Sequence, residues 1–170
     1  ETTDEIQENK ISTVSHGMFN LRRLCVEDVA IPKAEIVSVS ADIKKSELVS
    51  VFRESGLTRL PVYEGTLDNP IGMVHLKDFT LGYAFAKKNT FKIKDILRPL
   101  LYVPASMTIG VLLTKMQSDR RHLALGIDEY GGVDGLVTIE DLIEQVIGEI
   151  EDEHDIDEGQ MWTWESDNTI

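Results

Sequence analysis

Apolar positions in the first half of the chain follow two different periods. Leu48, Val49 and Phe52 are spaced as on one face of a helix. The apolar runs at Leu60–Tyr63 and Ile71–Val74 are too short for helices and are typical of strands. The segment between the two runs, Glu64–Pro70, is rich in Gly, Asn and Pro, so the sequence predicts a turn that joins them as a hairpin.

The same succession of elements returns in the second half of the chain. A helical face lies within Leu112–Met116, and strand-like runs at Leu123–Ile127 and Val133–Val137 flank a predicted turn at Asp128–Gly132. A last helix has a predicted apolar face at Leu142, Ile143, Val146, Ile147 and Ile150. Each copy therefore reads β-α-β-β-α, a small mixed sheet with helices on one side.

Matching segments identify this succession as an internal repeat. Val26–Pro32 returns as Ile93–Pro99 at an offset of 67 residues, and Ile71–Phe79 returns as Asp134–Leu142 at an offset of 63. Neither copy of about 60 residues can bury a generous core alone, so we expect the two to pack against each other. The predicted divisions are a leading helical segment (1–25), a first repeat (26–90), a second repeat (91–154) and an acidic tail (155–170).

The net charge of −13 belongs almost entirely to the C-terminal end of the chain. Residues 140–170 hold 12 acidic residues and no Lys or Arg, which leaves 18 acidic against 17 basic residues in the preceding part. A block of like charge is usually a solvated face or an interaction tail. A binder of nucleic acid needs clustered Lys and Arg to meet the phosphates, so no nucleic-acid partner is expected.

The sequence lacks the motifs of common enzyme sites, and we expect a protein that is not an enzyme. No phosphate-binding Gly-x-x-x-x-Gly-Lys-Ser/Thr loop is present. The four histidines, which are His16, His75, His122 and His154, show no metal-ligand spacing. Cys25 is the one cysteine and cannot form an intrachain disulfide.

The most specific motif places Thr138 three residues before Asp141, where the last helix begins. One interpretation is a capping box, which would contribute about 0.5–2 kcal/mol and needs no ligand. The other is a nucleotide site, because a helix N-terminus has free N–H groups, and a hydroxyl and a carboxylate can bond vicinal ribose hydroxyls. Gly135 on the preceding strand would then let a ligand approach the backbone. The spacing alone leaves both interpretations open and favours the cap.

A longer match brings in a known family. The tandem β-α-β-β-α unit, each copy ending Gly-h-h-x-x-x-Asp with h apolar, resembles a pair of CBS domains over Val26–Ile150; these regulatory modules are named after cystathionine β-synthase. The stretch Ile127–Asp155 resembles more narrowly the CorC/HlyC family, which is related to the cyclin M transporters and often labelled hemolysin-like. Glu54–Glu64 and Ile31–Lys33 fit the same family. The resemblance implies an α+β (α/β-type) fold, in which two CBS repeats pack as a pseudo-two-fold pair.

The resemblance also implies regulation by an adenosine nucleotide (AMP, ADP or ATP), with or without Mg²⁺, bound in clefts between the two copies. Thr138 and Asp141 would contact the ribose of one site. In the other copy Asp78 matches, but His75 stands where the hydroxyl should be and lacks a small capping hydroxyl. One competent site and a weak or empty one near Asp78 are therefore expected. The remaining predicted nucleotide-binding residues are Thr58, Arg59 and Pro61.

Arginines are the candidates for contacts with the phosphates: Arg59, Arg98, Arg120 and Arg121. Arg59 is favoured because it follows Thr58 in the segment that fits the family. The family usually has Arg where this chain has Lys33, so a two-pronged phosphate contact would become a point-charge contact there.

The family further implies an assembly. Its CBS pairs form homodimers and serve a membrane transporter domain, in cis or in trans, in proteins associated with magnesium and cobalt efflux. A cytoplasmic location follows, which includes the cytoplasmic face of the inner membrane as part of a longer chain. Residues 155–170, with Trp162 and Trp164, would be the truncated start of a downstream transporter-associated domain.

Two alternatives to a nucleotide site stay open. The acidic C-terminal helix could serve a divalent-cation sensor, with Glu140 and Glu144 as weak metal candidates on its polar side. Mg²⁺ usually takes only one or two carboxylates together with phosphates, which favours an ion bridged by a nucleotide. The second alternative is a dimerisation platform without a ligand.

Overall fold

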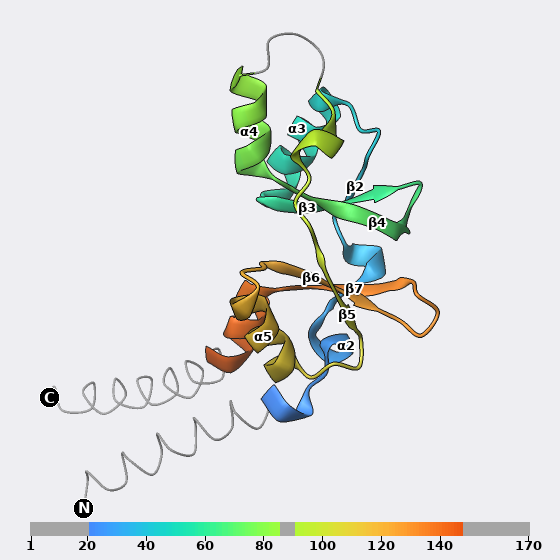
Figure 1. Cartoon of the computed structure of the whole chain (residues 1–170), viewed down its shortest axis with the longest axis vertical. Coiled ribbons are helices and arrows are strands. Elements are labelled where there is room, and N and C mark those ends of the chain that lie inside the picture. The colour runs from blue at the N-terminus through green and yellow to red at the C-terminus, as the bar shows by residue number, and fades with distance from the viewer. Residues whose placement is uncertain (1–20, 86–90, 148–170) are drawn as a thin grey trace, which may run out of the picture. The chain divides into compact units, whose positions relative to one another are not determined.

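Two compact units make up the described residues, 21–85 and 91–147, of the computed structural model (Figure 1). The first unit comprises the described residues within 1–29, 106–122 and 138–170, and the second comprises those within 30–105 and 123–137. Most of the expected leading helix and the whole acidic tail lie outside the described residues. In the described part of the chain, no helix is long and apolar enough to cross a membrane.

A three-stranded mixed sheet belongs to the second unit. Its strands are β2 (Val39–Ser40), β3 (Arg59–Glu64) and β4 (Thr66–His75). They lie in the order β2-β3-β4, with β2 parallel and β4 antiparallel to β3. The hairpin expected from the sequence is present, but its turn is much shorter than Glu64–Pro70. Gly65 turns the chain at a φ of 80°, and residues 66–70 already belong to β4, where a register irregularity beside Tyr63 absorbs them.

Helices α3 (Lys45–Ser55) and α4 (Leu76–Phe85) lie on the same face of this sheet (Figure 1). Leu48 and Phe52 are buried and Val49 is half-buried, which confirms the helical face expected for α3. The helix ends at Gly56, whose φ of 67° suits glycine and whose N–H donates to the Phe52 carbonyl. One core cluster joins the helices to the sheet: Val39, Leu48, Phe52, Leu60, Val62, Val74, Phe79 and Ile93.

A four-stranded sheet completes the second unit. Its strands are β1 (Ile31–Pro32), β5 (Leu101–Pro104), β6 (Leu123–Ile127) and β7 (Val133–Thr138). The order is β1-β7-β6-β5, with β5 parallel to β6 and β1 antiparallel to β7. Short 3-10 helices follow β1 and precede β5 as η1 (Lys33–Glu35) and η2 (Ile93–Ile96). The expected strands and their turn at Asp128–Gly132 are confirmed.

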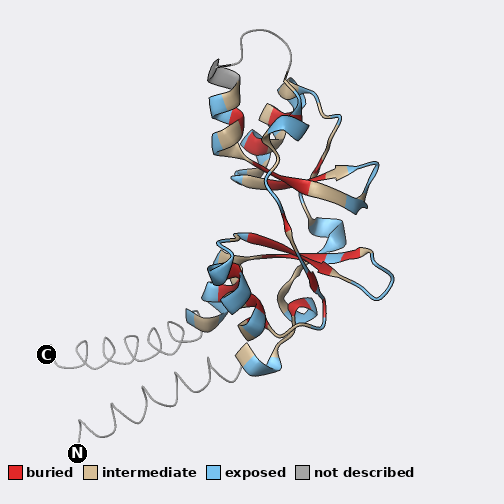
Figure 2. Ribbon diagram, in the orientation of Figure 1, coloured by how far each residue is buried: buried red, intermediate tan, exposed pale blue. Residues whose placement is uncertain are grey.

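The leading segments of the two repeats are exchanged. β1 precedes the first repeat's sheet in the chain, yet it pairs with β7 of the second repeat. In return, Arg98 ahead of β5 forms an isolated bridge to Met73 of β4, with N–H···O distances of 2.8 Å in both directions. A further core cluster of buried residues is visible as red strand segments in Figure 2: Met73, Leu100, Leu123, Leu125, Val133 and Leu136.

The first unit contains α2 (Val26–Val29), α5 (Ile109–Ser118) and a helix over 139–147. The Val26 N–H donates to the Met107 carbonyl at 2.8 Å and ties α2 to the segment before α5. Leu112 and Met116 are buried, as the sequence predicts. The side chains of this unit that are fully buried are Val26, Ile109, Leu112, Met116 and Leu142.

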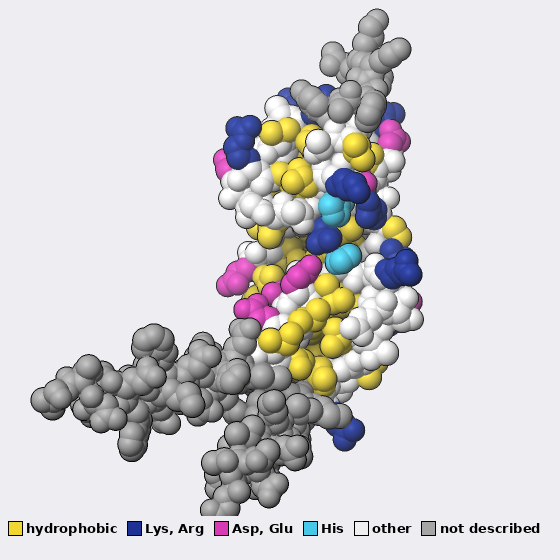
Figure 3. All heavy atoms as spheres, turned by 90° about the vertical axis from the view of Figure 1, so that its left-hand side faces the viewer, with side chains coloured by type: hydrophobic (Ala, Val, Ile, Leu, Met, Phe, Trp, Pro, Cys, Tyr) yellow, Lys and Arg dark blue, Asp and Glu magenta, His cyan; other side chains and the backbone are white. Residues whose placement is uncertain are grey.

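The apolar face expected for the last helix is only partly buried. Leu142 is buried, whereas Ile143 and Ile147 are 38% and 46% exposed, and Ile150 lies outside the described residues. The apolar arc of this helix is therefore wider than the side that packs. Figure 3 looks onto the side of α5 and shows hydrophobic side chains at the surface there.

Candidate functional site

The start of α4 gathers the predicted site residues of the first repeat. β3 and β4 pair so that Arg59 lies opposite His75, where β4 runs into the helix. The Leu76 N–H donates to the Thr58 carbonyl at 2.7 Å, which holds the start of β3 beside the first turn. Asp78 lies in that first turn. Four residues that the sequence singled out, Thr58, Arg59, His75 and Asp78, are thus brought to one helix N-terminus. Pro61 is buried in β3, opposite Met73.

His75 caps α4 with its imidazole. Its Nδ1 accepts a hydrogen bond from the Lys77 N–H at 2.9 Å, the bond that a Ser or Thr cap would accept. The sequence indicated that this position departs from a cap, and the structure corrects this, because an unprotonated ring nitrogen is also an acceptor. Burial, Arg59 and Arg98 lower the pKa of His75 and outweigh the opposing effect of Asp78.

Arg98 grips the carboxylate of Asp78. Its Nε donates to Asp78 Oδ2 at 2.5 Å and its Nη2 donates to Oδ1 at 2.8 Å, a two-pronged charge-assisted pair. The hydrogen bond from Arg98 lowers the pKa of the Asp78 carboxyl, although burial works in the opposite direction. The Asp78 side chain is 24% exposed. Arg98 was a candidate phosphate contact, and the structure places it on a carboxylate instead.

Thr138 and Asp141 form the corresponding motif of the second repeat. The Asp141 N–H donates to Thr138 Oγ1 at 3.1 Å, so Thr138 caps the helix over 139–147 as the capping interpretation predicts. The Ile139 N–H donates to the His122 carbonyl at 3.0 Å, as Leu76 does to Thr58 in the first repeat. Within residues 21–85 and 91–147, no hydrogen bond or ion pair reaches the Asp141 carboxylate.

Gly135 has a different role from the one that the sequence suggested. A Cβ at this position would stand 2.7 Å from the Ala30 Cβ and 2.8 Å from the Ile31 carbonyl oxygen. In the first repeat, a Cβ on Gly72 would stand 2.9 Å from the Arg98 carbonyl oxygen. The space beside each motif glycine is therefore filled by the exchanged leading segment, and not left for a ligand.

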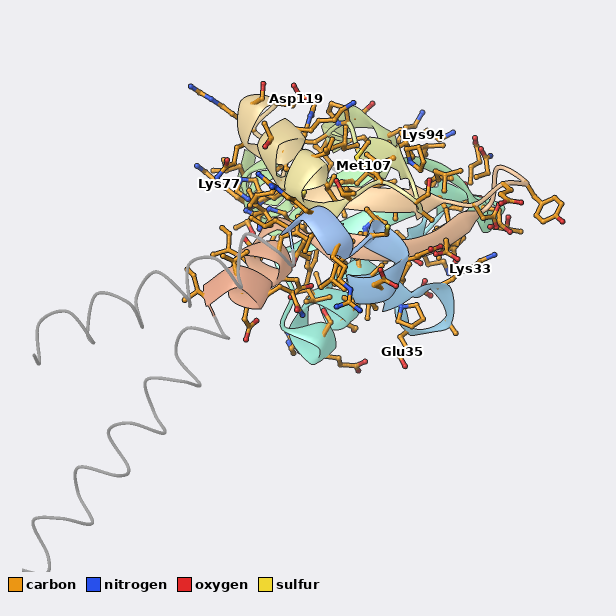
Figure 4. All side chains as sticks on the ribbon, turned by 90° about the horizontal axis from the view of Figure 1, so that it is seen from below. Lys33, Glu35, Lys77, Lys94, Met107 and Asp119 are labelled. Carbon is orange, nitrogen blue, oxygen red and sulfur yellow. The ribbon has the colours of Figure 1, made fainter. Side chains whose placement is uncertain are left out.

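Lys33 is bound to a carboxylate that the sequence did not single out. Its Nζ, labelled in Figure 4, lies 2.7 Å from both carboxylate oxygens of Asp68. Asp68 Oδ1 also accepts the Val133 N–H at 3.1 Å, and these bonds, chiefly the one from Lys33, lower the pKa of Asp68. Asp68 lies in the irregular part of β4, where hydrophobic periodicity carries no signal.

The metal candidates gain no further ligands. Glu140 and Glu144 are exposed, and Glu140 Oε1 lies 3.8 Å from His122 Nδ1. Among the residues that the structure describes, no three His, Cys, Asp or Glu side chains gather as a metal site would require. An all-protein cation site on this helix thus has no support in the described part of the chain.

The tandem β-α-β-β-α copies, each with a capped motif helix, define a pair of CBS domains. The CBS domain family matches residues 26–82 and 93–148. The chain belongs to this family, as a CBS pair of the CorC and hemolysin-like kind, which confirms the resemblance and the fold class expected from the sequence.

Similar proteins carry related names. "Possible hemolysin C" of Rickettsia akari (strain Hartford) is 42% identical over 140 residues, which cover 82% of this chain and 46% of that protein. The chain thus spans about half the length of the curated relatives that it matches most strongly. The solved CBS domain of a bacterial CNNM/CorC family Mg²⁺ transporter is 30% identical with a TM-score of 0.74, covering 79% of this chain and 82% of that one.

Two of the similar structures contain a nucleotide. The CNNM/CorC CBS domain in complex with ATP is 29% identical with a TM-score of 0.76, and the match covers 82% of this chain and 98% of that one. A CBS-domain pair with bound AMP from Klebsiella pneumoniae is 27% identical with a TM-score of 0.64, and the match covers 74% and 99%.

Proposed function

We propose that this chain is a regulatory, non-catalytic CBS pair that binds an adenosine nucleotide in a CorC- or hemolysin-like protein linked to magnesium and cobalt efflux. Thr138 and Asp141 hold the ribose. The observation that carries this proposal is the Asp141 carboxylate, which has no partner in the described part of the chain although it lies at a capped helix N-terminus. The ATP and AMP in the similar structures support the choice of ligand.

The chemistry of the motif suits a vicinal diol. An ionised Asp141 carboxylate only accepts hydrogen bonds, so it can receive the O–H groups of both ribose hydroxyls. Thr138 Oγ1 accepts the Asp141 N–H and keeps its own O–H to donate to a ribose oxygen. The N-terminal end of the helix also favours nearby negative charge. A nucleoside with both ribose hydroxyls is thus preferred over its deoxy form.

The first repeat supplies further predicted nucleotide-binding residues. We propose that Thr58 and Arg59 contact the nucleotide, and that Pro61 acts from inside β3 by shaping that segment. Asp78 marks the equivalent ribose position of this repeat, which we expect to be weak or empty. The repeats are proposed to extend over 26–90 and 91–154, and the tail over 155–170 to begin a transporter-associated domain.

Calorimetric titration tests this function. We would titrate AMP, ADP and ATP, each with and without Mg²⁺, into the wild type, Asp141→Ala and Asp134→Ala. Asp134 is an exposed residue of β7 and is the matched control. We expect at least a tenfold loss of affinity in Asp141→Ala and none in Asp134→Ala. Heat from Mg²⁺ but from no nucleotide would overturn the proposal in favour of a cation sensor, and binding that survives Asp141→Ala would assign the site to Asp78.

The assembly is proposed to be a cytoplasmic homodimer, formed through the CBS pair, that serves a transporter domain in cis or in trans. Two sets of exposed apolar surface support self-association. In the second unit an apolar groove of about 450 Å³ between α3 and α4 is lined by Phe52 and Phe79, among others. In the first unit Val111 and Ile147 are exposed on helices. The relationship to CBS domains of Mg²⁺ transporters supports the transporter partner.

A further inference from the structure

The two motif aspartates hold equivalent sequence positions but differ in what they contact. Asp78 and Asp141 lie 63 residues apart, at the same place in the matching segments of the two repeats. Both oxygens of Asp78 are bonded by the Arg98 guanidinium. The carboxylate of Asp141 is bonded by no side chain in the described part of the chain. The two repeats thus present a filled and an open copy of the same motif.

One sequence difference accounts for the filled copy. The bridge to Met73 places the backbone of Arg98 beside β4, from which its side chain reaches Asp78. At the offset of 67 residues between the leading segments, the counterpart of Arg98 is Ile31, which pairs with Leu136 of β7. An isoleucine side chain has no donor, so it cannot bond a carboxylate.

We propose that Arg98 occupies the ribose position of the first repeat and closes it to nucleosides, so that each chain takes one nucleotide, at Asp141. This inference rests on the proposed function. To accept a ribose, Asp78 would have to exchange a two-pronged bond to a cation for bonds to neutral hydroxyls, which are about half as strong. Arg98 is therefore a specificity-determining residue that competes with the ligand from within the chain.

The surroundings of Asp78 reinforce this closure. His75 Nδ1 is already used by the Lys77 N–H, so it offers the ribose no hydroxyl and no free acceptor at that atom. The Asp78 carboxyl has a lowered pKa, chiefly because Arg98 bonds it, and it stays ionised in mildly acidic solution. The ion pair thus persists over the whole range of pH in which the protein would meet a nucleotide.

The internal repeat supplies the substitutions for a gain-of-function test. Arg98→Ile and His75→Thr give the first repeat the residues that the second has at Ile31 and Thr138. In an Asp141→Ala background, where binding is lost, we expect the pair of substitutions to restore one nucleotide per chain by calorimetry. Asp78→Ala should abolish it again. With Asp141 intact, the same pair should raise the stoichiometry from one to two.

Lys94→Ile is the matched control for removing an ion pair. Lys94 Nζ lies 2.8 Å from Glu64 Oε1, and Lys94 and Lys77 lie on opposite sides of the molecule in Figure 4. This variant should gain no site. Arg98→Lys, a milder change that keeps the charge but not the two-pronged geometry, should give a second site at least tenfold weaker than that of Arg98→Ile with His75→Thr. It keeps the test informative if the larger change impairs folding, which thermal unfolding would show.

The outcomes separate this inference from the function on which it rests. A wild type that binds at Asp141, with no second site in any Arg98 variant that folds, overturns the closure by Arg98 and leaves the nucleotide function standing. A wild type with two equivalent sites also overturns the closure alone. No nucleotide binding in any variant overturns both.

Discussion

The Ile31 carbonyl oxygen lies 2.8 Å from the point where a Cβ on Gly135 would stand. Real Cβ atoms do not approach a backbone oxygen so closely, and neither neighbour can yield because both belong to paired strands, β1 and β7. The glycine of the motif is thus a condition for the pairing that attaches the first repeat's leading segment to the second repeat's sheet.

Gly135→Ala should therefore lower the free energy of unfolding by about 1–3 kcal/mol, as overpacking of a filled site does. Gly82→Ala is the control, since its Cβ would meet nothing closer than 3.9 Å within α4. That change should be neutral or stabilise by up to about 1 kcal/mol, because alanine favours helix. Urea unfolding of both variants tests this, and equal effects would contradict the role assigned to Gly135.

Thr138 should contribute separately to stability and to binding. Thr138→Ala removes the acceptor of the Asp141 N–H and should cost about 0.5–2 kcal/mol of stability, together with most of the nucleotide affinity. Thr138→Ser keeps the hydroxyl and should retain both. Denaturation curves and calorimetry on the two variants make the comparison. A serine variant as weak as the alanine variant in both measurements would contradict the hydroxyl's role.

His75 should make stability depend on pH. Its folded pKa is lowered from 6.5, so as pH falls through that value the unfolded chain takes up the proton first. The stabilisation is present above the unfolded pKa and is lost as pH falls toward the folded pKa. Arg59, Arg98 and Lys77 disfavour the charged imidazole, and Asp78 favours it.

His75→Asn keeps a capping acceptor but cannot titrate, so it isolates this effect. Urea unfolding between about pH 5 and pH 8 should show a smaller rise of stability with pH in the variant than in the wild type. Identical pH profiles would show that His75 does not carry the dependence.

The exposed apolar helix faces should drive self-association if the proposed homodimer forms. Val111 and Ile147 are 57% and 46% exposed, and Ile147→Glu or Val111→Glu would place a charge in a dimer interface. We expect each substitution to shift sedimentation velocity toward the monomer, with little change in thermal unfolding of the monomer. Val37→Glu, at an exposed apolar position between η1 and β2, is the control. An unchanged dimer in both helix variants would exclude these faces from the interface.

Much of the fold could be predicted because its signals are local. Leu48 and Phe52 lie on one helical face whatever the helix packs against, and short apolar runs such as Leu123–Ile127 carry strand propensity in themselves. The Thr138 cap was also readable, since its bond spans only three residues. The repeat made each of these interpretations stronger by showing them twice.

The errors concern contacts between residues distant in the chain. The exposure of Ile143 and Ile147 depends on how much of the helix is covered, which helical periodicity does not encode. The partner of Lys33 is Asp68, 35 residues away, in a strand whose irregular register no pattern announces. Gly135 was correctly singled out, but its reason lies in Ile31, a contact that appears only after β1 pairs with β7.

By itself the sequence determined the repeat, the order of strands and helices, and the motif residues Thr138 and Asp141, because periodicity and capping act within a few residues. Only the tertiary structure decided that the leading segments are exchanged and that Arg98 lies on Asp78. The physical reason is that a carboxylate three residues into a helix looks the same in both repeats. Whether it is open depends on a guanidinium that strand pairing brings from 20 residues away.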